Sequence, residues 1–173
     1  MKEILQEISF WYWLLGILLI ILLFLRKTLV FIWKTIQREW RLHKGLSRPI
    51  MIVIPKEEER KNSENMEEER KLMKNSGILN ISEDDYYASE SFEVENHSLI
   101  VLGYCKGMKN IDKVISVAEN KKIPLIVYTF RKYIDKNDSN KELIDNYKYS
   151  VLSITPLSLL NNIFSTLITY KYK

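Results

Sequence analysis

The feature that most constrains this chain is an uncharged run near its start, from Phe10 to Leu25, which reads FWYWLLGILLIILLFL. Only Gly16 and the hydroxyl of Tyr12 interrupt its aliphatic and aromatic side chains. Extended back to Ile8, a helix of this length rises by about 1.5 Å per residue and crosses most of a hydrocarbon core about 30 Å thick. We therefore predict that the chain begins with a membrane-spanning helix.

Charges are distributed unevenly on the two sides of this run. Before it stand Lys2, Glu3 and Glu7. After it come Arg26, Lys27, Lys34, Arg38, Arg41, Lys44 and Arg48, opposed in that segment only by Glu39. This asymmetry follows the positive-inside rule and predicts a single-pass protein whose C-terminal part is cytoplasmic. A cleavable signal peptide is disfavoured, because a basic pair follows the run where a small-residue cleavage site would stand.

The membrane contacts can be assigned from residue type. Aromatic rings at the start of the run suit the level of the lipid headgroups, and the basic pair after it suits the other surface. The assigned residues are Phe10, Trp11, Tyr12, Trp13, Gly16, Arg26 and Lys27. Because glycine permits a close helix contact, we expect homo-oligomers in the bilayer. The run offers no charge, so assembled copies would disrupt the bilayer rather than line a selective ion pathway.

The next segment, 28–48, has an amphipathic helical pattern. One face carries Leu29, Ile32, Trp33, Ile36 and Trp40, and the opposite face carries Lys27, Lys34, Arg38 and Arg41. Two interpretations compete: a helix lying on anionic lipid, or a continuation of the spanning helix that packs against other copies or its own domain. We favour continuation, because neither Pro nor Gly occurs between Gly16 and Gly45. Gly45 is the predicted C-cap.

These patterns divide the chain into an anchor (1–27), an amphipathic linker helix (28–48) and one cytoplasmic domain (49–173). The single cysteine, Cys105, excludes an internal disulfide framework, and the two histidines lack the spacing of metal ligands, so we predict no metal. We interpret Cys105 as structural, because no histidine is adjacent to activate it. The positive charge is concentrated beside the apolar run, and we therefore expect no binding to a nucleic-acid duplex.

Short apolar runs alternate with helical patterns through the domain. The predicted strands are 50–54, 78–81, 98–103, 125–130 and 149–154, and the predicted helices are 64–75, 111–120, 142–147 and 156–168. Alternation of this kind indicates an α/β fold with a parallel sheet of five strands and helices on both faces. We predict the flavodoxin-like, or Rossmann-like, doubly wound class, which binds ligands at the carboxyl ends of its strands.

Those strand ends carry hydroxyls, one aromatic ring and several cations. The candidate ligand-binding residues are Lys56, Tyr104, Lys106, Thr129, Arg131, Thr155 and Ser158. Cations and the start of the last helix would meet phosphates, and Tyr104 would stack on a base, so we predict an anionic, nucleotide-type ligand such as a cyclic nucleotide. The alternative, that each residue only packs, caps or is solvated, stays open.

Several chemistries are disfavoured by missing motifs. The sequence contains neither GxGxxG nor GxxxxGK[ST], so we expect no dinucleotide cofactor and no P-loop hydrolysis. A phosphorelay receiver needs acids where Lys56 and Tyr104 stand, although Thr129 would match that family. We predict no cofactor, and binding rather than catalysis.

Residues 49–155 contain PIMIVIP, then KNSGIL, then SLIVLGY followed by a helix and IPLIVYTF. This order of elements resembles a TIR domain. In TIR NAD hydrolases a glutamate lies in the helix after that later strand, and Glu119 in ISVAEN falls near the matching place. The resemblance implies NAD hydrolysis with Glu119 as the catalytic residue, as the enzymatic alternative to a sensor.

The layout of a membrane segment joined to a small Rossmann-like domain is similar to that of bacterial anti-phage membrane effectors, including CARF-type proteins. In those effectors a cyclic nucleotide or related messenger binds the soluble domain, and the assembled membrane segments breach the bilayer. The resemblance implies a sensor and effector in a bacterial inner or cell membrane. A membrane-tethered interaction scaffold without a ligand is the remaining alternative.

Overall fold

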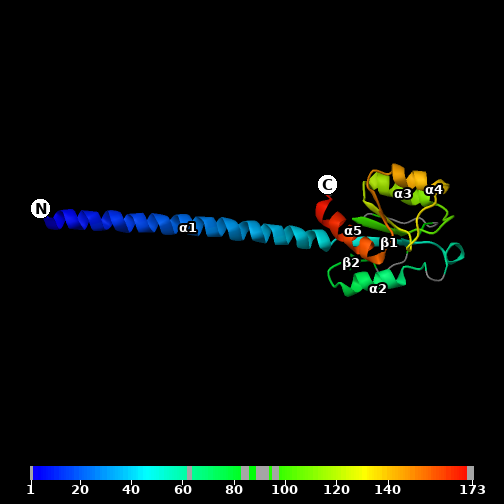
Figure 1. Ribbon diagram of the computed structural model, residues 1–173, viewed down its shortest axis with the longest axis horizontal. Helices are drawn as coiled ribbons and strands as arrows, with labels where there is room; N and C mark the ends of the chain where they lie inside the picture. Colours follow the sequence, from blue (N-terminus) through cyan, green and yellow to red (C-terminus); the bar gives the residue numbers. More distant parts are fainter. Residues whose placement is uncertain (1, 62–63, 83–85, 89–93, 95–97, 171–173) are drawn as a thin grey trace. The chain divides into compact units, whose positions relative to one another are not determined.

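The computed structural model describes residues 2–61, 64–82, 86–88, 94 and 98–170, with side chains from residue 12 onward. The chain forms two compact units, Met1–Leu42 and His43–Lys173. The first helix, α1 (Lys2–Leu46), makes up the first unit and ends within the second (Figure 1). The predicted contacts of Phe10 and Trp11 lie outside the described side chains.

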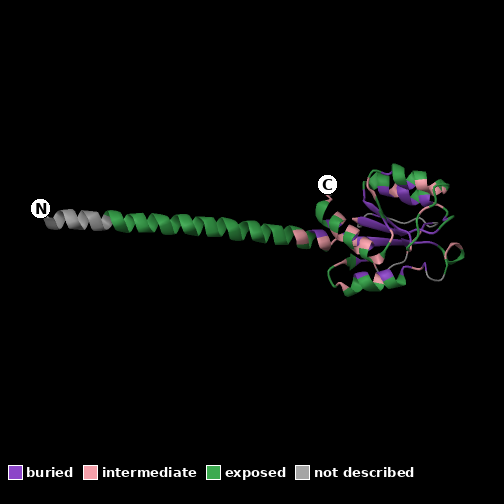
Figure 2. Cartoon of the chain, in the orientation of Figure 1, coloured by how far each residue is buried: buried purple, intermediate pink, exposed green. Residues whose placement is uncertain are grey.

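Helix α1 is unbroken over 45 residues, as the lack of an internal proline predicts. Among the described residues, the stretch Tyr12–Leu46 is the one helix long and apolar enough to cross a membrane, and its most apolar window is not buried in the structure (Figure 2). The Thr28 and Thr35 hydroxyls donate to the carbonyls of Phe24 and Phe31, at 2.9 and 3.0 Å. Both hydroxyls are therefore satisfied within the helix.

The second unit is built on a parallel sheet, which confirms the predicted α/β class. Its strands are β1 (Pro49–Ile54), β2 (Asn80–Ile81), β3 (Tyr86–Tyr87), β4 (Leu99–Gly103), β5 (Leu125–Tyr128) and β6 (Ser150–Ser153). The strand order is β2-β1-β4-β5-β6, and β3 pairs with the end of β1 beyond β2. The central strands β1, β4 and β5 are buried almost throughout, because helices cover both of their faces.

Alternate residues of these strands enter two separate cores. The helices are α2 (Glu67–Asn75), α3 (Ile111–Lys121), α4 (Ser139–Asn146) and α5 (Pro156–Thr169), with a short 3-10 turn, η1 (Glu57–Glu59), after β1. Met51 and Val127 pack with side chains of α3 and α4, whereas Ile52 and Ile126 pack with α2 and α5. The period of two explains why the strands are apolar at every position.

Several boundaries differ from the prediction for local reasons. Helix α2 begins at Glu67 rather than at 64, because Met66 before it has a left-handed backbone with φ of 61°. Helix α4 begins at Ser139 rather than at 142, because the Asp138 side chain accepts a hydrogen bond from the Asn140 amide and caps it. The stretch without clear period after Ile81 contributes the short strand β3.

The prediction that Gly45 caps α1 is wrong. The helix continues through Gly45 and ends at Leu46. A Cβ at position 45 would lie only 2.8 Å from the backbone oxygen of Leu167 in α5. Glycine is required there because two backbones approach closely, not because the chain turns.

Candidate functional site

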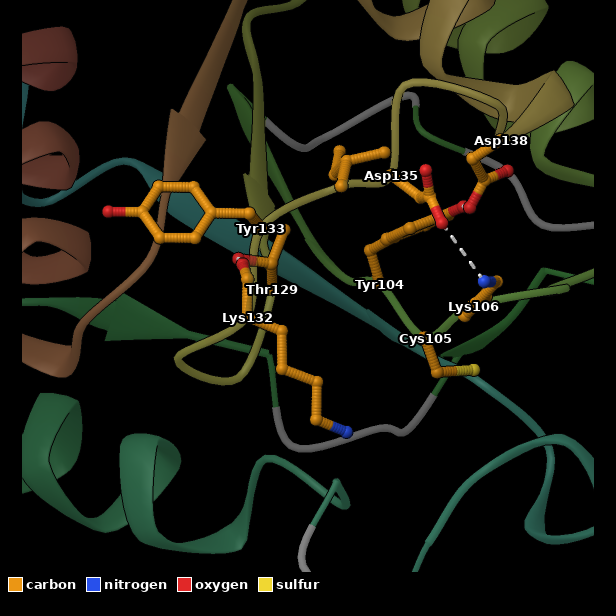
Figure 3. Close-up of a pocket in the computed structure, with 9 residues that line it drawn as sticks. Tyr104, Cys105, Lys106, Thr129, Lys132, Tyr133, Asp135 and Asp138 are labelled. Atoms are coloured by element: carbon orange, nitrogen blue, oxygen red, sulfur yellow. Dashed lines mark hydrogen bonds and ion pairs between the residues drawn. The ribbon is translucent and has the colours of Figure 1, made fainter.

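The carboxyl ends of β4 and β5 enclose a cavity of about 160 Å³. Its lining comes from the segment after β4 and from the loop that joins β5 to α4, and most of it is drawn in Figure 3. The lining residues are Tyr104, Cys105, Lys106, Thr129, Lys132, Tyr133, Ile134, Asp135 and Asp138. Three predicted ligand-binding residues, Tyr104, Lys106 and Thr129, are thus brought together.

A tight turn after β5 shapes this cavity. The Thr129 hydroxyl and backbone oxygen bond to the backbone of Lys132, the hydroxyl as donor at 2.5 Å and the oxygen as acceptor at 3.0 Å. Between them, Phe130 and Arg131 have positive φ values of 50° and 63°. This conformation costs about 1 kcal/mol or more for each residue other than glycine. The buried Thr129 side chain therefore stabilises a strained turn rather than facing a ligand.

Tyr104 lies against the loop that follows β5. Its hydroxyl donates to Asp138 Oδ2 at 2.5 Å, and the residue is 4% exposed. Burial, together with the hydrogen bond to Asp138, raises the pKa of Tyr104, so the phenol stays protonated at neutral pH. Little of the ring is accessible for stacking on a base. Tyr133 is 84% exposed, but its ring points away from Tyr104 (Figure 3).

Lys106 pairs with Asp135 across the mouth of the cavity. The distance from Nζ to Oδ2 is 3.2 Å, and the two side chains are 78% and 49% exposed. Hydrogen bonds from the Asn137 amide and from Lys106 lower the pKa of Asp135. Solvent screens an ion pair this exposed, so it contributes little to stability and a competing anion can replace Asp135 at little cost.

A second cavity, of about 270 Å³, lies beside the start of α2. Its lining residues are Glu64, Glu68, Glu69, Tyr128, Phe130, Arg131 and Lys132. Lys132 lines both cavities and pairs with the buried carboxylate of Glu64. This cavity is rich in acids, because three of its lining residues are glutamates, and Arg131 lines the same cavity. The Tyr128 hydroxyl donates to Glu69 Oε1 at 2.7 Å.

The Glu64 carboxylate is held ionised by its surroundings. Burial alone would raise its pKa, but the hydrogen bonds from the Lys132 ammonium and the Lys61 amide outweigh that effect, and the pKa lies below its ordinary value. The Lys132 ammonium is therefore already occupied by its ion pair with Glu64. Of the cations around the two cavities, Lys106 and Arg131 are the ones free to meet a ligand anion without disrupting a buried pair.

Cys105 has the surroundings of a structural residue. Its thiol donates to the Glu59 carbonyl at 3.1 Å, which ties the segment after β4 to η1. Burial and the nearby Glu64 and Glu59 carboxylates raise the pKa of Cys105 to about 11. A reactive thiol needs the opposite shift.

The remaining predicted residues lie elsewhere. Lys56 is exposed and lines neither cavity. The Thr155 side chain accepts from the Ser158 amide, while the Ser158 hydroxyl accepts from the Thr155 amide, so this capping box already uses part of the start of α5. Glu119 is exposed in the last turn of α3, towards the start of β5 and thus at the edge of the sheet opposite the cavities.

Sequence reasoning missed Lys132, Asp135 and Asp138. All three belong to the Lys- and Asp-rich loop after β5, which its composition marks only as a turn. Their position directly after a buried strand was the available signal, since that is where ligand contacts gather in parallel sheets. The described residues include no group of three or more His, Cys, Asp or Glu side chains placed to hold a metal ion.

No protein-family model, curated protein or solved structure matches this chain. The chemistry of the strand-end cavities is therefore the basis for a function.

Proposed function

We propose that this chain is a membrane-anchored sensor whose α/β domain binds a phosphate-bearing, nucleotide-type ligand between the ends of β4 and β5. The observation that carries the proposal is the cavity at the ends of these strands, with Lys106 at its mouth held only by a surface ion pair. A phosphate carries more charge than the Asp135 carboxylate and offers more acceptor oxygens, so it would compete well for Lys106. Arg131, at the adjoining cavity, is the second cation.

The sheet supports a flavodoxin-like assignment within the α/β class. With β2 and β3 taken as one interrupted edge strand, the order matches the 2-1-3-4-5 arrangement of that class. The usual ligand crevice of such folds would lie between β1 and β4. Here the chain after β1 is tied to the segment after β4 by the Cys105–Glu59 hydrogen bond. That contact favours ligand binding one strand further along, between β4 and β5.

In this proposal, the membrane anchor is the part of the sensor that acts on the bilayer. Helix α1 crosses a bacterial inner or cell membrane and leaves the α/β domain in the cytoplasm, in accord with the basic residues after the apolar run. Ligand binding changes how protomers associate, and association of the uncharged spans perturbs the bilayer, as an antiviral defence effector would. Removal of residues 1–25 should abolish leakage from vesicles and preserve ligand binding.

Thermal unfolding of the full chain in detergent, with a panel of inorganic phosphate, mononucleotides, cyclic nucleotides, cyclic dinucleotides and NAD, tests the proposal. A ligand at about 100 times its Kd stabilises the native state by about 2.7 kcal/mol, which is a readily measured rise in Tm. We expect a nucleotide to raise the Tm and Lys106→Gln or Arg131→Gln to reduce that rise.

Lys56→Gln is the matched control, because it removes an equal charge from a strand end that lines neither cavity. It should leave the ligand-induced rise in Tm unchanged. The proposal fails if no nucleotide shifts the Tm, or if Lys106→Gln and Lys56→Gln respond alike. NAD turnover that Glu119→Gln abolishes would instead establish the enzymatic alternative.

A further inference from the structure

The segment of α1 from Arg26 to Arg41 combines positive charge with exposed indole rings. It holds five basic residues and a single carboxylate, Glu39. Trp33 and Trp40 are 63% and 64% exposed, and together with Ile36 they line a shallow groove on one side of the helix. Indoles favour the boundary between hydrocarbon and headgroups, and cations favour the headgroups themselves.

Within the part of the chain that the structure describes, no carboxylate forms an ion pair with the cations of this segment. Arg26, Lys27, Lys34 and Arg38 have no ion-pair or hydrogen-bond partner among the described residues. Arg41 donates to the backbone oxygen of Gln37, at 3.3 Å. An anionic surface outside the chain is therefore the complement that these side chains lack.

Lengths along the helix place the cations within reach of a lipid surface. Arg38 follows Arg26 by twelve residues, which corresponds to about 18 Å of helix. A headgroup layer of about 5–7 Å and a Debye length of about 8–10 Å cover nearly the same distance. Because α1 is unbroken here, an α1 that spans the bilayer would carry Arg26, Lys27 and Lys34 through that zone and would place Arg38 at its outer limit.

We propose that the segment Arg26–Arg41 binds anionic phospholipid headgroups and so makes the protein selective for negatively charged lipid. A second copy fits the segment less well, since side-by-side helices would bring unpaired cations together with only Glu39 to offset them. This inference rests on the anchor of the proposed function and is independent of any ligand at the strand ends.

Fluorescence tests it well, because all four tryptophans lie in α1. The full chain with Trp11→Phe and Trp13→Phe, reconstituted in phosphatidylcholine vesicles, reports only on Trp33 and Trp40. We expect brominated phosphatidylglycerol to quench these indoles more than an equal fraction of brominated phosphatidylcholine, with a relative association about two- to fivefold higher. Salt at about 1 M should remove the preference.

Lys34→Gln with Arg38→Gln should bring the two lipids to equal quenching. Lys113→Gln with Lys121→Gln is the matched control, because it removes the same charge from exposed positions of α3, and it should retain the preference. Equal quenching at low salt, or a preference that survives Lys34→Gln with Arg38→Gln, would overturn the inference. Absence of quenching by either lipid in protein that floats with the vesicles would show that the indoles do not contact lipid, and it would also overturn the inference. Protein that does not float would refute the anchor itself.

Discussion

The Glu64 carboxylate is buried and depends on two donors, the Lys132 ammonium and the Lys61 amide. Without an ammonium partner, such a carboxylate bears the cost of its own desolvation. The Lys132 backbone also closes the turn after β5, because its amide and its carbonyl both bond to Thr129. The two residues between them have left-handed backbones that are otherwise unfavourable. The single Glu64–Lys132 pair therefore joins the loop before α2 to the cavity between β4 and β5.

Lys132→Met should lower the free energy of unfolding at about pH 7 by about 1–3 kcal/mol, because Glu64 loses its charged partner. In the native chain the lowered pKa of Glu64 stabilises the fold above the carboxyl's ordinary value of 4.5, and this contribution is lost as pH falls through the folded-state pKa. In the variant, burial raises the pKa and Glu64 takes up a proton instead. Chemical unfolding across this range should show the deficit shrinking towards about pH 4.

Glu64→Gln combined with Lys132→Met is the control, since it removes both charges. It should recover much of the stability that Lys132→Met loses. A deficit that is equal at acidic and neutral pH would mean that the ion pair does not stabilise the domain.

Among the elements, the last turn of α1 packs closely against α5, because Gly45 lies beside the backbone of that helix. Replacing glycine by alanine inside a helix ordinarily gains about 1 kcal/mol. At Gly45 the new methyl would lie 2.8 Å from a main-chain oxygen that no side-chain rotation can move. We expect this steric clash to outweigh the gain in helix propensity, so that the substitution lowers the stability of the domain.

Gly45→Ala should therefore destabilise the α/β domain by about 1–3 kcal/mol, measured by thermal unfolding of the full chain in detergent. Gly16→Ala is the control, because nothing lies within 4 Å of a Cβ at that position. It should leave the unfolding of the domain unchanged. A Gly45→Ala protein as stable as the parent would contradict the close approach.

The central strands and α1 were predictable because long apolar runs have few alternatives: β1, β4 and β5 lie within runs that read as buried strands. The turn after β5 was not, because Phe130 and Arg131 are not residues that signal a left-handed backbone. Tertiary contacts also decide that Asp135 meets Lys106 and that Asp138 meets Tyr104. Spacing in the sequence does not encode such pairs.

At the scale of the whole molecule, α1 carries a candidate span, and the second unit is a parallel α/β domain with cavities at the ends of its strands. The predicted ligand-binding and catalytic residues separate into four groups. Tyr104, Lys106 and Thr129 share one cavity, and Arg131 lines the next. Lys56 and the capping pair of α5 line neither, and Glu119 lies at the other edge of the sheet.

Hydrogen exchange on the full chain, with and without the nucleotide that raises the Tm most, tests the central claim most directly. The bound ligand should slow exchange in the segments 104–108 and 129–138, which line the cavity between β4 and β5. Exchange at the end of α3 around Glu119 should not change. Protection confined to that end of α3, or no protection in either cavity segment, would contradict a strand-end ligand site.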